Sequence, residues 1–325
     1  MKKMLIFVLM LALMTPVFAL AEGEPGQAYS LTTGLPTDQP YKAMAVLFDN
    51  SADARPQKNM SQADIIYEIE IADGGHTRYL AIYNDEIPEE VEAVRSARIM
   101  HADVSLDWCA TLVHFGGQKL AGSSVYDYFK TVDLNRFDGL SDSKNFYRDF
   151  TRVAPYNVVG RLRQMYDSVD AQNEELIHTP LKFSADEPTV KGKNSTVFRI
   201  PYGANIGFYP SYEYIKKDGV YRRFYNRKDM LDGATGEAYE FSNVIVMYAD
   251  YSWFDDAADR PIVALTGTNK CEYFIGGKHF TGSWVRNSVG ESTAYLDDEG
   301  TEVLFKPGKT FIQIVKPDVE IELVK

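Results

Sequence analysis

The first clear pattern along the chain is a period of two. In residues 65–71, isoleucine and tyrosine side chains share one face, while Glu68 and Glu70 lie on the other. This alternation predicts a half-buried β-strand. The glycines of residues 73–75 allow a reversal, and residues 79–83 can return as the partner strand. We therefore predict a β-hairpin.

Other apolar segments complete the first half of the chain. The runs at residues 43–48 and 109–115 predict two more strands. Residues 99–108 predict a short helix, because apolar positions recur four apart there. The segments 121–130 and 156–169 have helical composition.

Beyond about residue 195 the pattern of apolar and polar residues changes. Short aromatic and β-branched runs alternate with turn signals, which contain glycine at residues 217–219, 232–233, 276–277, 298–300 and 307–308. This spacing predicts a mainly antiparallel β half.

The N-terminus has the three parts of a secretory signal peptide. Lys2 and Lys3 precede an apolar run at residues 4–17, and Ala19 and Ala21 form a small-x-small cleavage site. The run is shorter than the roughly 20 apolar residues of a spanning helix. No cysteine lies near Ala21 to accept a lipid. We predict a secreted or envelope-associated protein without a lipid anchor, which meets the membrane only through its signal peptide.

Charge and cysteine content narrow the possible partners. The 325 residues include 34 Lys and Arg against 46 Asp and Glu, a formal net charge of −12. This acidity argues against nucleic acid and anionic membrane surfaces as partners. The only cysteines, Cys109 and Cys271, exclude a disulfide framework. The 21 tyrosines fit half-buried strand positions better than a sugar-stacking surface.

Motifs for nucleotide, acyl and metal chemistry are incomplete. Residues 307–310 end like a phosphate-binding loop but lack its earlier glycine. Ser141 and Lys144 have the spacing of a nucleophile and its lysine, without the companion Lys-Thr-Gly. The five histidines are dispersed and match no metal-binding motif. We predict no metal site and no cofactor.

Polar residues at predicted strand ends or beside glycines form the candidate ligand-binding set. Its members are Arg55, Glu68, Arg78, Arg95, Ser96, Arg98, His114, Gly116, Gly117, Tyr147, Arg148 and Asn157. Arg95 and Arg98 flank a small Ser-Ala pair, so two guanidinium groups can approach one carboxylate or phosphate. Alternatively, the arginines pair with Glu68, Asp64 or Asp103 and only tie strands together.

These motifs resemble the YerB-like family of Gram-positive bacteria, described by a domain of unknown function, DUF3048, and its C-terminal domain. The matching segments are residues 33–36, 45–50, 54–57, 63–68, 74–78, 94–98, 113–117, 147–149 and 154–157, then 232–236, 243–246, 282–284 and 307–315. The family includes many lipoproteins, and Tyr156 stands where relatives often have histidine.

The resemblance implies an α+β fold, a layered sandwich of two mostly antiparallel β-sheets with a helical layer. With it we divide the chain into a signal peptide (1–21), a linker (22–41), an N-terminal α+β domain (42–190) and a mainly β C-terminal domain (191–325) packed on the first. The resemblance implies no reaction, because the family's activity is unassigned.

Two functional hypotheses follow, beside a third interpretation in which arginines buried in ion pairs make the chain a purely structural or assembly protein. The first is a non-catalytic envelope module that binds a wall component or an envelope protein through residues 95–98 and nearby tyrosines. The second is a wall-active hydrolase or transferase, in which Glu68, Asp103 or His114 moves protons while Arg95 and Arg98 hold an anion. The missing catalytic motif favours the first.

Overall fold

The computed structural model describes residues 27–120, 122–184, 188, 190–202, 209–254 and 260–324. The α-helices are α1 (Ile99–Asp107), α2 (Val125–Tyr128) and α3 (Leu162–Asp167), and the 3-10 turns are η1 (Ala52–Ala54), η2 (Met60–Gln62) and η3 (Glu174–Leu176). The strands are β1 (Met44–Asp49), β2 (Ile65–Ala72), β3 (His76–Tyr83), β4 (Val91–Glu92), β5 (Thr111–His114), β6 (Arg136–Asp138), β7 (Phe146–Arg148), β8 (Val158–Gly160), β9 (Lys182–Phe183), β10 (Lys193–Asn194), β11 (Val197–Arg199), β12 (Pro210–Ile215), β13 (Val220–Tyr225), β14 (Lys228–Asp229), β15 (Glu240–Phe241), β16 (Asn243–Tyr248), β17 (Tyr251–Trp253), β18 (Pro261–Val263), β19 (Gly267–Ile275), β20 (Lys278–Arg286), β21 (Ala294–Asp297), β22 (Leu304–Phe305), β23 (Thr310–Val315) and β24 (Glu322–Val324).

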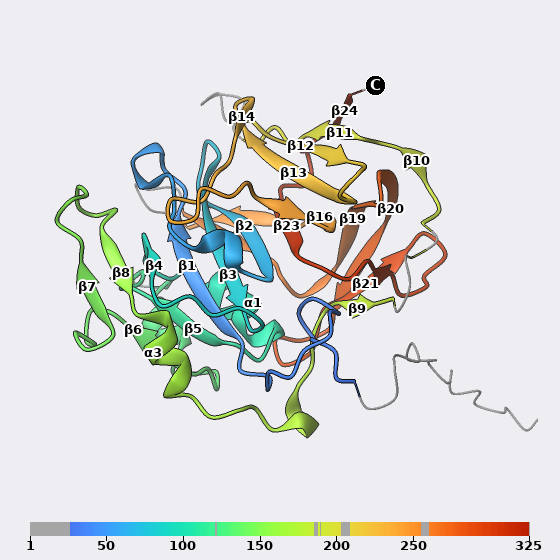
Figure 1. The fold of residues 1–325 in the computed structure, drawn as a ribbon. Coiled ribbons are helices and arrows are strands. Elements are labelled where there is room, and N and C mark those ends of the chain that lie inside the picture. The colour runs from blue at the N-terminus through green and yellow to red at the C-terminus, as the bar shows by residue number, and fades with distance from the viewer. Residues whose placement is uncertain are drawn as a thin grey trace, which may run out of the picture.

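A large mixed sheet runs through the molecule (Figure 1). Its strand order is β10-β20-β19-β16-β23-β2-β3-β1-β5-β6, with β21 paired to β20. β2 from the first half of the chain pairs in parallel with β23 from the last. β1 pairs in parallel with β5, and β5 with β6. Both halves of the sequence therefore build one sheet.

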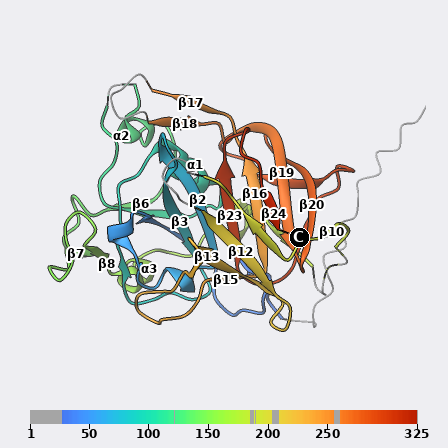
Figure 2. The ribbon, with the colours of Figure 1, turned by 90° about the horizontal axis from the view of Figure 1, so that it is seen from above.

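Apolar clusters cover both faces of this sheet. All six residues of β1 are buried, as expected of a strand with covered faces. One cluster includes side chains of α1 and α2, and the other includes side chains of β12, β13 and α3. Figure 2 shows these two groups of elements on opposite sides of the sheet.

A second, antiparallel sheet closes one of these faces. Strands β14, β13, β12, β11 and β24 follow one another, and β15 pairs with β13. Phe198 of β11 stacks on Phe274 of β19, with ring centroids 3.6 Å apart. The turns predicted at residues 217–219 and 276–277 connect β12 to β13 and β19 to β20.

The expected α+β sandwich with a helical layer is wrong. The fold is mostly β, and the described residues hold three short α-helices, the longest of nine residues. The segments 121–130 and 156–169 keep only α2 and α3, because glycine or strand residues interrupt each. Among the described residues, the largest sheet is mixed: six of its ten strand pairs are antiparallel, as expected, whereas β1–β5, β5–β6, β2–β23 and β16–β23 are parallel.

Three predicted features are confirmed: the hairpin, the strand at residues 43–48 and the helix at residues 99–108. Their ends agree with the structure within two residues, except that β3 begins three residues earlier than predicted. The expected half exposure of β2 is wrong. Glu68 is fully buried and Glu70 is 2% exposed. The alternation assigned the Glu68 face of β2 to solvent, but the second sheet covers it. Arg223 of β13 contacts Glu68 on this face.

The predicted signal peptide lies outside the described residues and stays a prediction, as does the division into domains. Part of the segment expected to be a linker packs on the body: Thr32 and Thr33 are buried, and Thr33 accepts a hydrogen bond from the Gly308 N–H at 2.7 Å. Within the described ranges, no helix is both long and apolar enough to cross a membrane.

Candidate functional site

The candidate site lies where parallel strands end. β1, β5 and β6 point the same way, so Asp49, His114 and Asp138 end at one edge of the sheet. Arg78 at the start of β3 stands opposite Asp49 in the register. The loop at residues 95–98 crosses this edge and is fixed by backbone bonds to β1 and β5 neighbours. Such edges are common ligand sites in open sheets.

We call Arg78, Arg95, Ser96 and Arg98 the arginine rim. The Arg95 Nε donates to the Asp49 carboxylate at 2.6 Å. Burial disfavours the Asp49 anion, but hydrogen bonds from Ser51 and the charge of Arg95 outweigh it and hold its pKa below the ordinary value. Asp49 therefore stays ionised and fixes Arg95 at the sheet edge.

Arg78 is buried behind this loop. It donates to the Ser96 carbonyl at 2.6 Å and to the Ser96 hydroxyl at 3.1 Å. Its Nε has no hydrogen-bond partner among the described residues. Burial, followed by the charges of Arg98 and Arg95, lowers its pKa to about 9. The rim thus concentrates positive charge that its own carboxylate does not fully offset.

Arg98 and two histidines lie deeper in the rim. Arg98 donates to the Gln118 side chain at 2.7 Å, and its backbone N–H donates to His101 Nδ1 at 3.0 Å. His114 Nδ1 lies 2.8 Å from the Gly116 carbonyl. Burial is the largest cause that lowers the pKa of both histidines, so both are neutral at pH 7.

The two candidate glycines shape the backbone. Gly116 has a φ of +76°, and its N–H donates to Asp138 at 2.9 Å. A Cβ on Gly117 would lie 2.5 Å from the Val125 side chain. Gly117 therefore allows α2 to pack closely, and a structural requirement accounts for it.

The β7–β8 hairpin carries three further candidates, Tyr147, Arg148 and Asn157. Arg148 is exposed, donates to Asn157 at 2.8 Å and lies 5.1 Å from the Phe115 ring. The Arg95 guanidinium lies 5.7 Å from the Tyr156 ring, which belongs to the same hairpin. Tyr147 points to another neighbour and donates to Glu90 at 2.8 Å.

Glu68 and Arg55 stand apart from the rim. Glu68 accepts from Arg223 at 2.6 Å and from Asn50 and Thr77, in a buried network between the two sheets. The Arg55 guanidinium lies 3.5 Å from the Tyr225 ring and lines a separate cleft. Thus the structure joins the residues around 95–98 and 148–157, but not these two.

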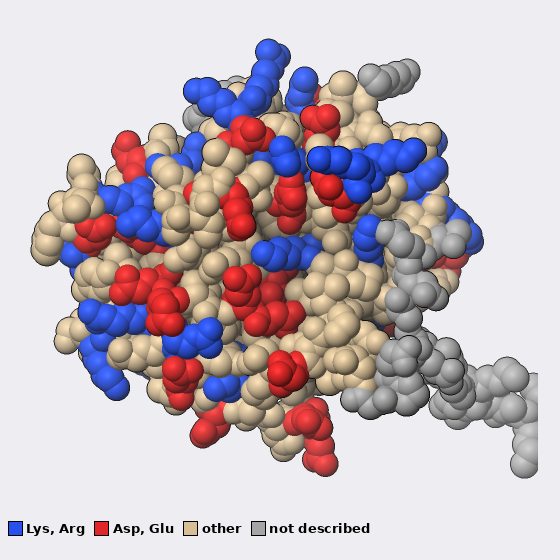
Figure 3. All heavy atoms as spheres, viewed as in Figure 1, with Lys and Arg blue, Asp and Glu red and all other residues tan. Residues whose placement is uncertain are grey.

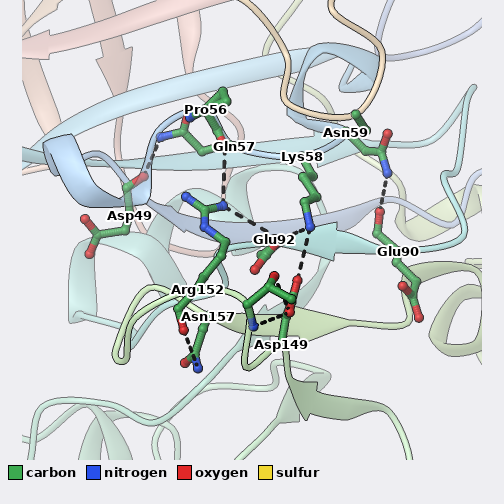
Figure 4. A network of polar contacts seen from close by, with 12 residues as sticks. Asp49, Pro56, Gln57, Lys58, Asn59, Glu90, Glu92, Asp149, Arg152 and Asn157 are labelled. Atoms are coloured by element: carbon green, nitrogen blue, oxygen red, sulfur yellow. Dashed lines mark hydrogen bonds and ion pairs between the residues drawn. The ribbon is translucent and has the colours of Figure 1, made fainter.

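The separate cleft is open and has a volume of about 630 Å³. It is lined by Asp53, Arg55, Pro56, Lys58, Thr151, Arg152, Val153 and Gly233. Figure 4 shows Lys58 between two carboxylates, at 2.5 Å from Glu92 and 3.4 Å from Asp149. Arg152 lies 3.7 Å from Glu92.

The ionisation of Lys58 and Asp149 does not suit proton transfer in the cleft. The Glu92 hydrogen bond raises the pKa of Lys58, and Thr151 leads the causes that lower the pKa of Asp149. Both groups are therefore ionised at neutral pH, whereas a general acid or base titrates near the working pH. Glu68, Asp103 and His114 do not line the cleft. The arrangement suits electrostatic binding.

Sequence reasoning missed Lys58, Glu92 and Arg152. Lys58 follows the quoted motif at 54–57, and Glu92 shortly precedes the motif at 94–98. Their proximity to those motifs was the only indication of a functional role in the sequence. The three side chains come from segments far apart in the sequence, so their contacts could not be predicted.

Comparisons with known proteins agree on one family. Residues 32–175 match "Protein of unknown function (DUF3048) N-terminal domain", and residues 198–312 match its C-terminal domain. The chain is 30% identical over 299 residues to "Putative lipoprotein YerB" of Bacillus subtilis (strain 168), covering 89% of this chain and 86% of that protein. The crystal structure of YerB protein from Bacillus subtilis matches with a TM-score of 0.77 and 27% identity, over 91% of this chain and 100% of that chain.

Proposed function

The chain belongs to the YerB-like family, whose two domains have no assigned function, and from this premise we propose that it is an extracytoplasmic, non-catalytic binding module. Its ligand is an anionic group of a cell-wall component, held at the arginine rim. The location is supported by the predicted signal peptide and by the relative named as a lipoprotein. The absence of a lipid anchor stays a prediction.

The observation that carries the proposal is the position of Arg78, which is buried against Ser96 with its Nε lacking a hydrogen-bond partner among the described residues. Burial, and next the charges of Arg98 and Arg95, lower the pKa of Arg78 to about 9, so the neighbouring guanidinium groups repel one another there. An anion bound beside Ser96 relieves that repulsion. Binding of a carboxylate or phosphate to such a group uses charge-assisted hydrogen bonds.

The loop geometry supports the same ligand class. Ser96 is half-buried and follows Arg95 in a loop whose Ala97 N–H donates to the Gly116 carbonyl at 2.9 Å. Arg148 and Tyr156 stand at the side of the hairpin. An anionic polymer can place its charged groups on the guanidinium groups of the rim and its sugar or peptide surfaces on the Tyr156 ring.

Cosedimentation with isolated cell walls tests the proposal. The secreted chain is expected to sediment with walls at low salt and to be released as salt increases, because screening weakens contacts between exposed charges. Arg95→Gln removes one charge-assisted contact, worth about 1.5–3 kcal/mol, so wall affinity is expected to fall roughly 10- to 100-fold.

Arg227→Gln is the matched control, since Arg227 is an exposed arginine in the turn between β13 and β14. It is expected to sediment like the unaltered chain. Equal wall affinity of the Arg95 and Arg227 variants, with both folded by circular dichroism, would refute the rim as the binding surface. Retention on a protein fraction alone would instead identify an envelope protein as the partner and contradict the wall ligand.

A further inference from the structure

The 630 Å³ cleft differs from the rim because it presents charges of both signs. We propose that it binds a short zwitterionic peptide, with the peptide carboxylate at Arg152 and the peptide ammonium at Asp53. This site is separate from the arginine rim, and the two bind different chemical groups.

Lys58 is not the receptor for the carboxylate, although it lines the cleft. Its ammonium group contacts Glu92 at 2.5 Å and Asp149 at 3.4 Å, as Figure 4 shows. Two carboxylates around one ammonium leave the group with no excess positive charge. An incoming anion therefore gains little there.

Arg152 is better placed to receive a carboxylate. Its guanidinium donates to the Pro56 carbonyl at 3.3 Å and to the Asp53 carbonyl at 3.2 Å, and it lies 3.7 Å from Glu92. These contacts are longer than the usual 2.9–3.0 Å of an N–H to oxygen bond. A ligand carboxylate is a stronger acceptor than a backbone carbonyl and can bind a guanidinium through two parallel bonds.

The loop that carries Arg152 is already ordered. Asp149 accepts from the Thr151 N–H at 2.8 Å and from its hydroxyl at 2.6 Å, and the Asn157 side chain donates to the Arg152 carbonyl at 3.3 Å. Because these bonds fix the loop before a ligand arrives, binding costs little conformational entropy.

Asp53 supplies the opposite charge in the cleft lining. Its side chain is exposed, while its backbone carbonyl is the group that holds Arg152. The ammonium and carboxylate receptors are therefore close to each other in the cleft lining. The cleft lining carries the carboxylate of Asp53 together with the cations Arg55, Lys58 and Arg152, so a zwitterion can pair with charges of both signs.

The space between the charges is suited to a peptide backbone. Pro56 and Val153 line it with apolar surface, and a Cβ on Gly233 would come within 3.0 Å of the Pro56 carbonyl. A cleft of this volume is in the range that holds small ligands. An extended peptide advances about 3.3–3.6 Å per residue, so two or three residues extend over roughly 7–11 Å.

Calorimetric titration with four forms of trialanine tests the proposal on the full secreted chain. The forms are the free zwitterion, the N-acetylated anion, the C-amidated cation and the neutral peptide capped at both ends. We expect the zwitterion to bind at least about tenfold more tightly than either singly capped form. No binding of the zwitterion at 10 mM, or equal binding of all four forms, would overturn the proposal.

Two variants locate the effect. Asp53→Asn is expected to abolish the preference for the zwitterion over the N-acetylated form, while the affinity for the N-acetylated form stays within about twofold. Asp133→Asn, at an exposed aspartate before β6, is expected to change neither. A preference that survives in Asp53→Asn, or that Arg95→Gln removes instead, would place the peptide outside this cleft and contradict the proposal.

Discussion

Asp64 shows how one carboxylic acid can fasten a chain segment. Its carboxylate accepts from the Thr32 hydroxyl at 2.7 Å and from the Asn84 N–H at 2.8 Å, which joins residues before β1 to the end of β3. Burial, and next the charge of Asp85, raise its pKa to about 7 from the usual 3.8. The folded state therefore holds a proton between about pH 4 and pH 7 that the unfolded state releases.

Asp64→Asn is expected to change the pH dependence of stability. Since the folded pKa is raised, the contribution of Asp64 is greatest below about pH 4 and is lost as pH rises through 7. The variant cannot titrate, so its free energy of unfolding relative to the unaltered chain should increase with pH, by up to about 4 kcal/mol for this shift. Urea unfolding at pH 4 to 8 measures it, and a pH-independent difference would be inconsistent with this account.

Elements β2 and β13 are joined by a buried ion pair. Arg223 donates to Glu68 at 2.6 Å, and both side chains are 0% exposed. The neighbouring residue Arg222 pairs with Glu240 at the same distance, but these side chains are about one-third exposed. The same strand thus offers one buried and one hydrated pair for comparison.

Arg223→Met is expected to lower the free energy of unfolding by about 3–5 kcal/mol, because it leaves the Glu68 charge buried and unpaired. Arg222→Met should cost less than about 1 kcal/mol, because water replaces a partly exposed partner. Denaturant titration of both variants compares them directly. If both variants lose the same free energy of unfolding, burial of the ion pair between Arg223 and Glu68 does not determine its contribution to stability.

At this scale the sequence predicts single elements well. Period-two alternation correctly predicts β2 and its hairpin with β3, and the spacing of apolar residues correctly predicts α1. The same alternation misassigns the face of Glu68, because the covering sheet comes from residues more than 120 positions later. Local patterns report which residues can share a face, but not what covers that face.

For the whole molecule, the contacts that define the fold and the cleft are non-local. β2 pairs with β23 across about 240 residues, and no local pattern encodes that register. Lys58, Glu92 and Arg152 come from three separate segments, whereas the rim residues Arg95 and Arg98 share one motif. The rim residues could therefore be singled out from sequence, and the cleft could not.

Photocrosslinking in living cells shows whether the arginine rim touches the cell wall. A benzophenone side chain replaces Leu140, which is 57% exposed and lies beside Gly116 at the rim, or Leu304, which is 52% exposed on β22. We expect adducts with wall material, identified by mass spectrometry, from position 140 and not from position 304. Wall adducts that are equal from both positions, or absent from position 140, would contradict it.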